Sequence, residues 1–391
     1  MMRIYLDYNA SAPVVPEAVA ATTAALSDRF GNPSSVHYFG QQARAVLDDA
    51  RDEVAALIGA EPVEVVFTSG GTEADNLAIR GVAEAAASRG RRHVVATAIE
   101  HEAVLHTVRE LSRRGCDVTL LPVDASGIVD PSALASAIRP DTALVTVMHA
   151  NNEVGTLQPV AELAALAHEA GAVFHTDAVQ TVGRIAVDVR ALGADLLSLS
   201  GHKLGAPKGI GALWVRRGTK LAPLMTGGRQ ERNRRPGTEN VPAAAGLGAA
   251  ARVARNTLAE QGPRVAALRD RLDAGVLAGV PGAAINGNPA RRIPGTSNIS
   301  FEGVEAEALL IALDLEGVAV STGSACSSGT LEPSHVLRAM GLGAHRVQSA
   351  LRFSLGAGTT AEEIDRVVTL LPDLVTRIRS RSGRAVGPSR R

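Results

Sequence analysis

The chain has 391 residues, too many for one ordinary hydrophobic core, so we expect two domains that share an interface. Its 40 basic and 40 acidic side chains give a formal net charge of zero, which argues against binding nucleic acid or an anionic membrane through bulk charge. With only two cysteines, a disulfide framework and a thiolate metal site within one chain are excluded, which fits a reducing compartment.

The first segment is predicted to be a short extended piece at residues 4–13, followed by helices from residue 16. An arginine and an aspartate stand within the first seven residues, so we expect no secretory signal. No uncharged apolar run is long enough to span a bilayer. We therefore expect a cytoplasmic protein.

Between residues 64 and 200, short apolar runs alternate with amphipathic helical patterns, which predicts a mostly parallel α/β sheet. The strands are predicted at 64–68, 93–97, 117–121, 143–148, 172–176 and 195–200, with helices that begin at 72, 102 and 160. Ligands of such sheets bind at the carboxyl ends of the strands. Polar residues stand just past those ends here: Ser69, Asn152, Asp177 and Lys203.

The remainder of the chain predicts a second, α+β domain. Gln261-Gly262-Pro263 interrupts a long helical region. Beyond it we expect a strand near 297–301, a helix at 305–313 and a terminal helix from 361. We expect the large domain at 13–258, the small domain at 1–12 and 259–378, and a disordered basic tail at 379–391.

Lys203 follows the apolar run 195–200 and has small neighbours. A lysine that binds a cofactor aldehyde covalently needs this setting, although a lone lysine is more commonly an ion-paired surface residue. Asp177 also ends an apolar run, and it either caps a turn or pairs with a pyridinium nitrogen. Gln180 lies one helical turn later and would face the same way.

A strand–glycine–helix junction spans residues 68–73. Backbone N–H groups at a helix N-terminus, together with the Thr72 hydroxyl, suit a phosphate dianion, and Ser200 and His202 are available to close the other side. The alternative is a plain N-cap with Glu73 in the first turn.

His101 and His106 superficially resemble a zinc-binding helix, but their spacing of five residues separates them by about 140°, so we exclude a metal site there. His101 either stacks on a cofactor ring or lies on the surface at a helix start. Asn152 either forms a turn or donates a hydrogen bond to cofactor or substrate.

Cys326 lies among serine, alanine and glycine in residues 323–329, a setting that suits a reactive thiol that must move, whereas Cys116 is interpreted as structural. Arg352 within the apolar run 351–355 either snorkels at a sheet edge or clamps an amino-acid carboxylate. Lysine, acid and thiol together favour pyridoxal phosphate chemistry on a sulfur-containing substrate.

These motifs resemble those of the cysteine desulfurases of the NifS/IscS type, pyridoxal phosphate enzymes of the class V aminotransferase family. The resemblance covers nearly the whole chain, through segments 5–7, 30–35, 68–76, 100–101, 151–153, 175–180, 200–203, 323–326 and 351–356. The chain departs from the family pattern at Tyr8, where asparagine is usual, and at Ser11-Ala12, where a threonine pair is usual.

The resemblance implies fold type I, with a mostly parallel, mixed seven-stranded sheet in the large domain and a smaller α+β C-terminal domain, working as a homodimer. It implies catalytic roles for Lys203, Cys326 and His101, and substrate binding by Asn152 and Arg352. The cofactor, pyridoxal 5′-phosphate, would be held by Gly71, Thr72, His101, Asn152, Asp177, Gln180, Ser200, His202 and Lys203, and by Thr238 of the partner subunit.

The implied reaction removes sulfur from L-cysteine, giving L-alanine and a persulfide on Cys326 that passes to a sulfur acceptor, either an iron–sulfur scaffold or a tRNA-thiolation enzyme. We expect no metal in the cofactor site and no direct contact with nucleic acid. One alternative is an aminotransferase or another lyase on the same scaffold, which would tolerate loss of Cys326. The other is a non-enzymatic sulfur-delivery partner with a decayed site.

Overall fold

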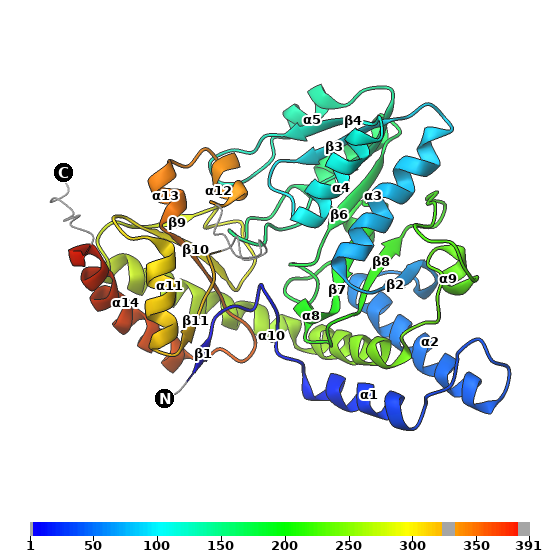
Figure 1. The fold of residues 1–391 in the computed structure, drawn as a ribbon, viewed down its shortest axis with the longest axis horizontal. Coiled ribbons are helices and arrows are strands. Elements are labelled where there is room, and N and C mark those ends of the chain that lie inside the picture. The colour runs from blue at the N-terminus through cyan, green and yellow to red at the C-terminus, as the bar shows by residue number, and fades with distance from the viewer. Residues whose placement is uncertain (1–2, 323–332, 382–391) are drawn as a thin grey trace.

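The computed structural model describes residues 3–322 and 333–381, and it contains a larger and a smaller part with separate hydrophobic cores (Figure 1). The larger part is built on a seven-stranded sheet, and the smaller part on a three-stranded sheet. Within the described ranges, no helix combines the length and the apolar content needed to cross a bilayer.

The large sheet has the strand order β2-β8-β7-β6-β5-β3-β4. Within it β8 runs antiparallel to both neighbours and the other pairs are parallel, which confirms the predicted mixed, mostly parallel sheet of seven strands. The strands are β2 (Val65–Thr68), β3 (His93–Thr97), β4 (Asp117–Leu121), β5 (Thr142–Thr146), β6 (Val173–Asp177), β7 (Leu196–Ser200) and β8 (Gly211–Val215).

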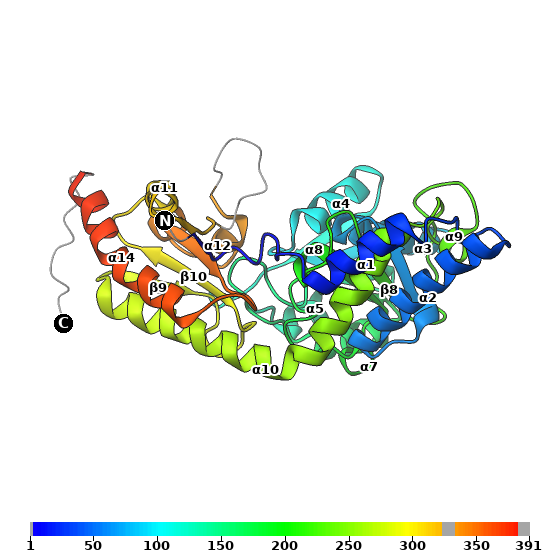
Figure 2. The same ribbon diagram turned by 90° about the horizontal axis from the view of Figure 1, so that it is seen from below.

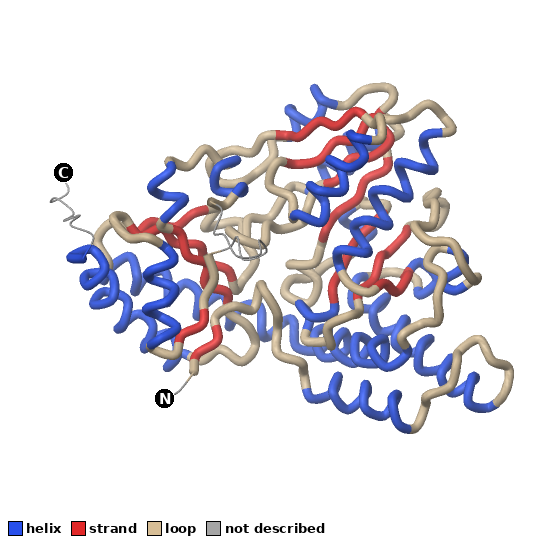
Figure 3. The backbone as a smooth tube through the Cα atoms, in the orientation of Figure 1, coloured by secondary structure: helices blue, strands red, loops and turns tan. Residues whose placement is uncertain are grey.

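Helices cover both faces of this sheet, which explains why its central strands β5, β6 and β7 are buried along almost their whole length (Figure 3). One face packs on α3 (Gly71–Ala87) and α4 (Glu102–Arg113). The other packs on α2 (Tyr38–Ile58), α6 (Val160–Glu169) and the first half of α10 (Val241–Gly279). Shorter elements complete this part: α1 (Pro16–Ser27), the 3-10 helix η1 (Pro62–Glu64), α5 (Pro131–Ala137), α7 (Val189–Leu192), α8 (Gly201–Leu204) and α9 (Gln230–Asn233).

The small sheet is antiparallel, with the order β12-β10-β9, where β9 is Ala283–Asn286, β10 is Thr296–Phe301 and β12 is Ala350–Ser354. Beside it, β1 (Ile4–Tyr5) pairs in parallel with β11 (Val318–Ala319), so the first strand of the chain belongs to the small part. The helices here are α11 (Ala306–Leu315), α12 (His335–Ala339), α13 (Ala344–Gln348) and α14 (Ala361–Arg381).

The predicted interruption at residues 261–263 is wrong, because α10 continues through Pro263. A proline inside a helix costs about 3 kcal/mol locally. The helix before it packs on the large core through Leu247, and the helix after it packs on the small core through Leu272, so tertiary burial outweighs that cost. Figure 2 shows α10 passing beneath both parts of the molecule.

The C-terminal helix also differs from the prediction. α14 begins at Ala361 as expected but ends at Arg381, inside the segment 379–391 that the sequence indicates to be disordered. Residues 382–391 lie outside the described part. The exact domain boundaries near residues 13 and 258 stay a prediction.

Candidate active site

The polar residues predicted at the strand ends meet at one edge of the large sheet. Asp177 is the last residue of β6, and Ser200 is the last residue of the neighbouring β7. The two strands are parallel, with Asp177 opposite Ser198, so their carboxyl ends lie side by side. The short helix α8 begins directly after β7 and carries His202 and Lys203. The convergence follows from strand order, as expected for a doubly covered sheet.

A cavity of about 380 Å³ lies where α3 begins. The N-cap residue of α3 is Gly70, which has no side chain to accept hydrogen bonds from the first N–H groups of the helix. These free N–H groups and the helix dipole therefore favour binding of an anion at this end of α3. The cavity is lined by Ala10, Ser11, Ser69, Gly70, Gly71, Thr72, Glu73, Ser200, His202, Lys208, Gly209 and Ile210. The predicted phosphate residues Gly71, Thr72, Ser200 and His202 are therefore together.

Glu73 occupies the first turn of α3, as the plain N-cap interpretation requires. Its carboxylate, however, accepts from the Ser69 N–H at 2.7 Å and pairs with Arg235 at 2.8 Å. Burial alone would raise the pKa of Glu73, but the hydrogen bonds from Arg235 and Ser69 lower it below its usual range. Arg235 thus neutralises this acid at the cavity rim.

Asp177 is a buried carboxylate that accepts one hydrogen bond from the Val179 N–H at 2.9 Å. Burial raises its pKa, and the nearby charge of Lys203 opposes this rise without reversing it. A buried carboxylate needs a cationic partner, and a protonated ring nitrogen is one. The bond from the Val179 N–H is the contact of a turn former, and the burial of the carboxylate also suits a ring-nitrogen partner, so the pairing role of Asp177 stays a prediction.

Two further carboxyl groups are buried near Asp177. Burial raises the pKa of Asp75 well above its ordinary value, and the charge of Asp177 raises it further. Burial also raises the pKa of Glu100 to about 8, although hydrogen bonds from Thr97 and the Met148 N–H favour its charged form. Glu100 is therefore mostly protonated at pH 7 and burial favours the protonated form of Asp75, whereas the charge of Lys203 opposes the rise in the pKa of Asp177.

His101 is the N-cap residue of α4, and its Nδ1 accepts from the Ala103 N–H at 3.1 Å. Burial lowers the pKa of His101, so its ring is neutral near pH 7. A neutral ring that accepts at Nδ1 carries its proton on Nε2. His101 can therefore donate a proton or a hydrogen bond from Nε2.

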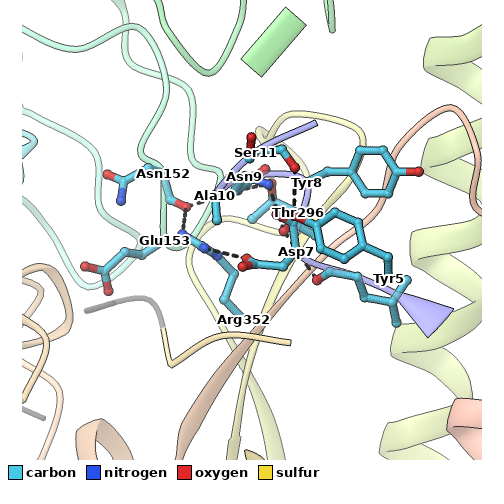
Figure 4. A network of polar contacts seen from close by, with 12 residues as sticks. Tyr5, Asp7, Tyr8, Asn9, Ala10, Ser11, Asn152, Glu153, Thr296 and Arg352 are labelled. Atoms are coloured by element: carbon cyan, nitrogen blue, oxygen red, sulfur yellow. Dashed lines mark hydrogen bonds and ion pairs between the residues drawn. The ribbon is translucent and has the colours of Figure 1, made fainter. Parts of the chain in front are cut away.

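The N-terminal residues Asp7–Ala12, which we call the crossing segment, run from the small part to the active-site edge of the large sheet (Figure 4). Lys203 Nζ donates to the backbone carbonyls of Asn9 and Ala10, the latter at 2.9 Å. Gln180 Nε2 donates to the Asn9 carbonyl at 3.1 Å. The crossing segment therefore holds two of the predicted cofactor residues by main-chain contacts.

Asn9 is buried and bonded to both parts of the molecule. Its side-chain amide donates to the Asn152 carbonyl at 3.0 Å and to Thr296 Oγ1 at 2.9 Å. Its backbone N–H donates to Ser354 Oγ at 2.9 Å, and its side-chain oxygen accepts from Arg184. Asn9 was not predicted, because a polar residue in a short N-terminal turn has no local pattern that marks it as a hub, and Arg184, which follows β6, was not predicted either.

Arg352 lies on β12 and is 3% exposed, so it does not snorkel at an edge. Its NH1 donates to the Asn152 carbonyl at 3.0 Å and its NH2 donates to Asp7 Oδ1 at 2.8 Å (Figure 4). Its Nε is buried and has no hydrogen-bond partner among the described residues. An anion that reached this nitrogen would satisfy it, which fits the predicted carboxylate clamp. The carboxamide of Asn152 extends away from this network.

The structure leaves the predicted roles of Thr238 and Cys326 untested. Thr238 is exposed in the loop after α9 and is not among the residues that line the cavity. That position agrees with the expectation that it serves another subunit, but does not test it. Cys326 lies outside the described residues, so its predicted role stays a prediction.

Comparison with known proteins defines the family. The family model described as aminotransferase class-V matches residues 4–367. The chain belongs to the class-V aminotransferase family. Such enzymes and their cysteine desulfurase members depend on pyridoxal phosphate, which confirms the predicted cofactor.

Similar proteins indicate which activity within this family the chain has. The chain is 49% identical over 384 residues to a cysteine desulfurase of Gluconacetobacter diazotrophicus, covering 98% of this chain and 96% of that one. It is 46% identical to the cysteine desulfurase IscS of Methanosarcina thermophila, covering 97% and 93%. A solved structure named NifS-like protein superposes with a TM-score of 0.90 at 35% identity, covering 96% and 100%. The predicted desulfurase family and fold class are confirmed.

Proposed function

We propose that this class-V enzyme removes sulfur from L-cysteine, leaving L-alanine and a persulfide on Cys326. The observation that carries this proposal is the meeting of Lys203, the buried carboxylate of Asp177 and the anion-binding start of α3 at one sheet edge. The identities of 46–49% to named cysteine desulfurases support the same reaction.

The residues fit pyridoxal phosphate. Gly71, Thr72, Ser200 and His202 would hold its phosphate, as the uncapped start of α3 and the 380 Å³ cavity support. Asp177 would hold its ring nitrogen, and Lys203 would bind its aldehyde. His101, Asn152, Gln180 and the partner subunit's Thr238 would complete the contacts. When bound, the cofactor withdraws electrons from the substrate Cα and so stabilises negative charge there.

Each protein group then has a defined task. Lys203 Nζ, which the crossing segment holds through two carbonyls, moves the proton at the substrate Cα. Arg352, with its buried and unsatisfied Nε, binds the substrate carboxylate. Neutral His101 donates its Nε2 proton or shuttles that of the thiol. Asp177, whose pKa burial raises, would be held in its charged form by the protonated ring nitrogen.

The transfer of sulfur to Cys326 needs no additional oxidant or reductant. The Cys326 thiolate attacks the sulfur of the substrate, the S–S bond forms, and the substrate C–S bond breaks. The carbon accepts a proton and leaves as L-alanine, and Cys326 keeps the persulfide. This persulfide then passes to a sulfur acceptor, either an iron–sulfur scaffold or a thiolation enzyme.

Two further features belong to the proposal. A homodimer is supported by a cluster of exposed aromatic side chains around the start of α2, where Phe39 contacts both Phe30 and Tyr38. Phe30, Tyr38 and Phe39 are 66%, 68% and 49% exposed. A cytoplasmic location is supported by the small number of cysteines.

The decisive experiment uses the Cys326→Ala variant of the holoenzyme. We expect it to retain the visible absorbance of the bound cofactor and to lose both the persulfide and L-alanine release from L-cysteine. Cys116→Ala is the matched control and should behave like the parent, because Cys116 lies just before β4, is partly buried, and packs against the core formed with α3 and α4. Normal L-alanine release by Cys326→Ala would refute the desulfurase mechanism and favour an aminotransferase or another lyase.

A further inference from the structure

Asp7 lies next to Arg352 because of backbone pairing between distant segments. Asp7 forms a parallel bridge with Ser354, whose N–H donates to the Leu6 carbonyl at 2.8 Å and whose carbonyl accepts from the Tyr8 N–H at 3.1 Å. Arg352 is two residues from Ser354 on β12, so their side chains point to the same face of the strand. The main chain therefore fixes the Asp7 carboxylate beside the guanidinium.

The guanidinium is held on two sides. Asp7 Oδ1 accepts from NH2 at 2.8 Å, and the Asn152 carbonyl accepts from NH1 at 3.0 Å. The Asn152 carbonyl is itself held by the Asn9 amide at 3.0 Å (Figure 4). A guanidinium has five N–H donors in a fixed plane, so two anchored nitrogens define where the others point. The unsatisfied Nε belongs to that remaining set.

Charge gives a second reason for Asp7 to be present. The Arg352 side chain is 4% exposed and the Asp7 side chain 20% exposed, so the cation is largely desolvated and needs a nearby anion. Arg184 is a second cation close to Arg352. Burial and the positive charge of Arg352 lower the pKa of Arg184 to about 10. Without Asp7, two cations would face each other across the crossing segment.

We propose that Asp7 is a positioning residue for substrate binding: by accepting a hydrogen bond from Arg352, it holds the guanidinium so that its remaining N–H groups receive the α-carboxylate of the substrate. This inference rests on the proposed role of Arg352. Asp7 itself does not touch the substrate in this account. The buried Nε of Arg352 has no hydrogen-bond partner among the described residues, so the guanidinium keeps an unused donor.

The experiment compares Asp7→Ala, which has no acceptor, with Asp7→Asn, which keeps an acceptor oxygen without the charge. We expect Asp7→Ala to raise KM for L-cysteine about 10-fold with kcat changed less than about twofold, since a lost positioning contact removes uniform binding. We expect Asp7→Asn to return KM to within about threefold of the parent. Asp365→Ala is the matched control, because it removes an exposed Arg–Asp pair, to Arg271, with no change expected in KM.

Two binding measurements separate positioning from a general structural role. The Kd of L-alanine, measured by calorimetry on the holoenzyme, should rise about 10-fold in Asp7→Ala. The Kd of cysteamine, which has the amine and thiol but no carboxylate, should not change. An equal loss for both ligands would overturn the proposal, as would an Asp7→Asn variant as impaired as Asp7→Ala.

L-alanine binding is also measured for Arg352→Ala, so that failure of this inference can be told from failure of the proposed function. If Arg352→Ala weakens L-alanine binding and Asp7→Ala does not, Asp7 has no positioning role although the carboxylate site is correct. If Arg352→Ala binds L-alanine like the parent, the carboxylate site itself is wrong, and Asp7 loses its role with it. Thermal unfolding of every variant checks that each is folded.

Discussion

We expect the substitution Gly211→Ala to disturb the active-site edge of the large sheet, because the paired strands there leave no room for a Cβ atom. Gly211 is the first residue of β8 and stands opposite Thr68 of β2 and Ser200 of β7. A Cβ at this position would lie 2.7 Å from the Gly70 Cα and 2.7 Å from the Leu199 carbonyl oxygen. These are backbone atoms, which cannot rotate away as a side chain does.

The size of the effect follows from the required displacement. Ordinary contact begins at 3.4 Å, so the segment around Gly70 or the end of β7 must move by about 3.4 − 2.7 = 0.7 Å. Overpacking of this kind costs about 1–3 kcal/mol of folding free energy. The same movement shifts the first N–H groups of α3, and one lost hydrogen bond to a charged group costs about 1.5–3 kcal/mol. Gly211→Ala should therefore bind pyridoxal phosphate about 10- to 100-fold more weakly.

The assay is titration of cofactor-free protein with pyridoxal phosphate, followed by absorbance, together with thermal unfolding of the same protein. Gly262→Ala is the control, since Gly262 lies inside α10 and a Cβ there would meet its nearest atom at 3.9 Å. That control should gain up to about 1 kcal/mol of stability from helix propensity and keep its cofactor affinity. Parent-like affinity and melting temperature in Gly211→Ala would refute this account of the site edge.

Three further predictions concern buried charges and the cofactor lysine. Glu231→Gln breaks a buried ion pair in which both carboxylate oxygens bind Arg51, at 2.7 and 2.8 Å. It should reduce the free energy of unfolding, measured by urea titration, by about 3–5 kcal/mol. The exposed control Asp365→Ala should reduce it by about 0–1 kcal/mol. Burial raises the pKa of Glu100 from 4.5 to about 8, so the folded state holds a proton that the unfolded state loses, and parental stability falls between pH 4.5 and 8 by up to about 1.4 kcal/mol per pH unit. Glu100→Gln lacks this loss, and a parent-minus-variant difference that stays constant from pH 5 to 8 would contradict the assignment. Lys203→Ala should lose the visible absorbance of the bound cofactor and all turnover, and retained turnover would disprove its catalytic role.

Six strands of the large sheet could be predicted because each is a short, mostly apolar run in a region where such runs alternate with helical patterns. The position of β8 was not predicted, because its short apolar run 212–215 directly follows the glycine-rich residues 205–211. The continuity of α10 across Pro263 was missed for another reason. Local propensity opposes the helix there, and only packing on two separate cores maintains it.

The active site also contains residues that the sequence predicted and residues that it did not. Lys203, Asp177 and the start of α3 could be placed from the sequence alone, because a parallel sheet brings the ends of its strands together whatever the rest of the chain does. Asp7 and Asn9 could not, since their partners Arg352 and Ser354 stand 345 residues away and no local pattern records a contact of that separation. Periodicity and strand ends thus determined the cofactor side of the site. The substrate side was decided by tertiary structure, where the first residues of the chain cross between the two parts and anchor the arginine.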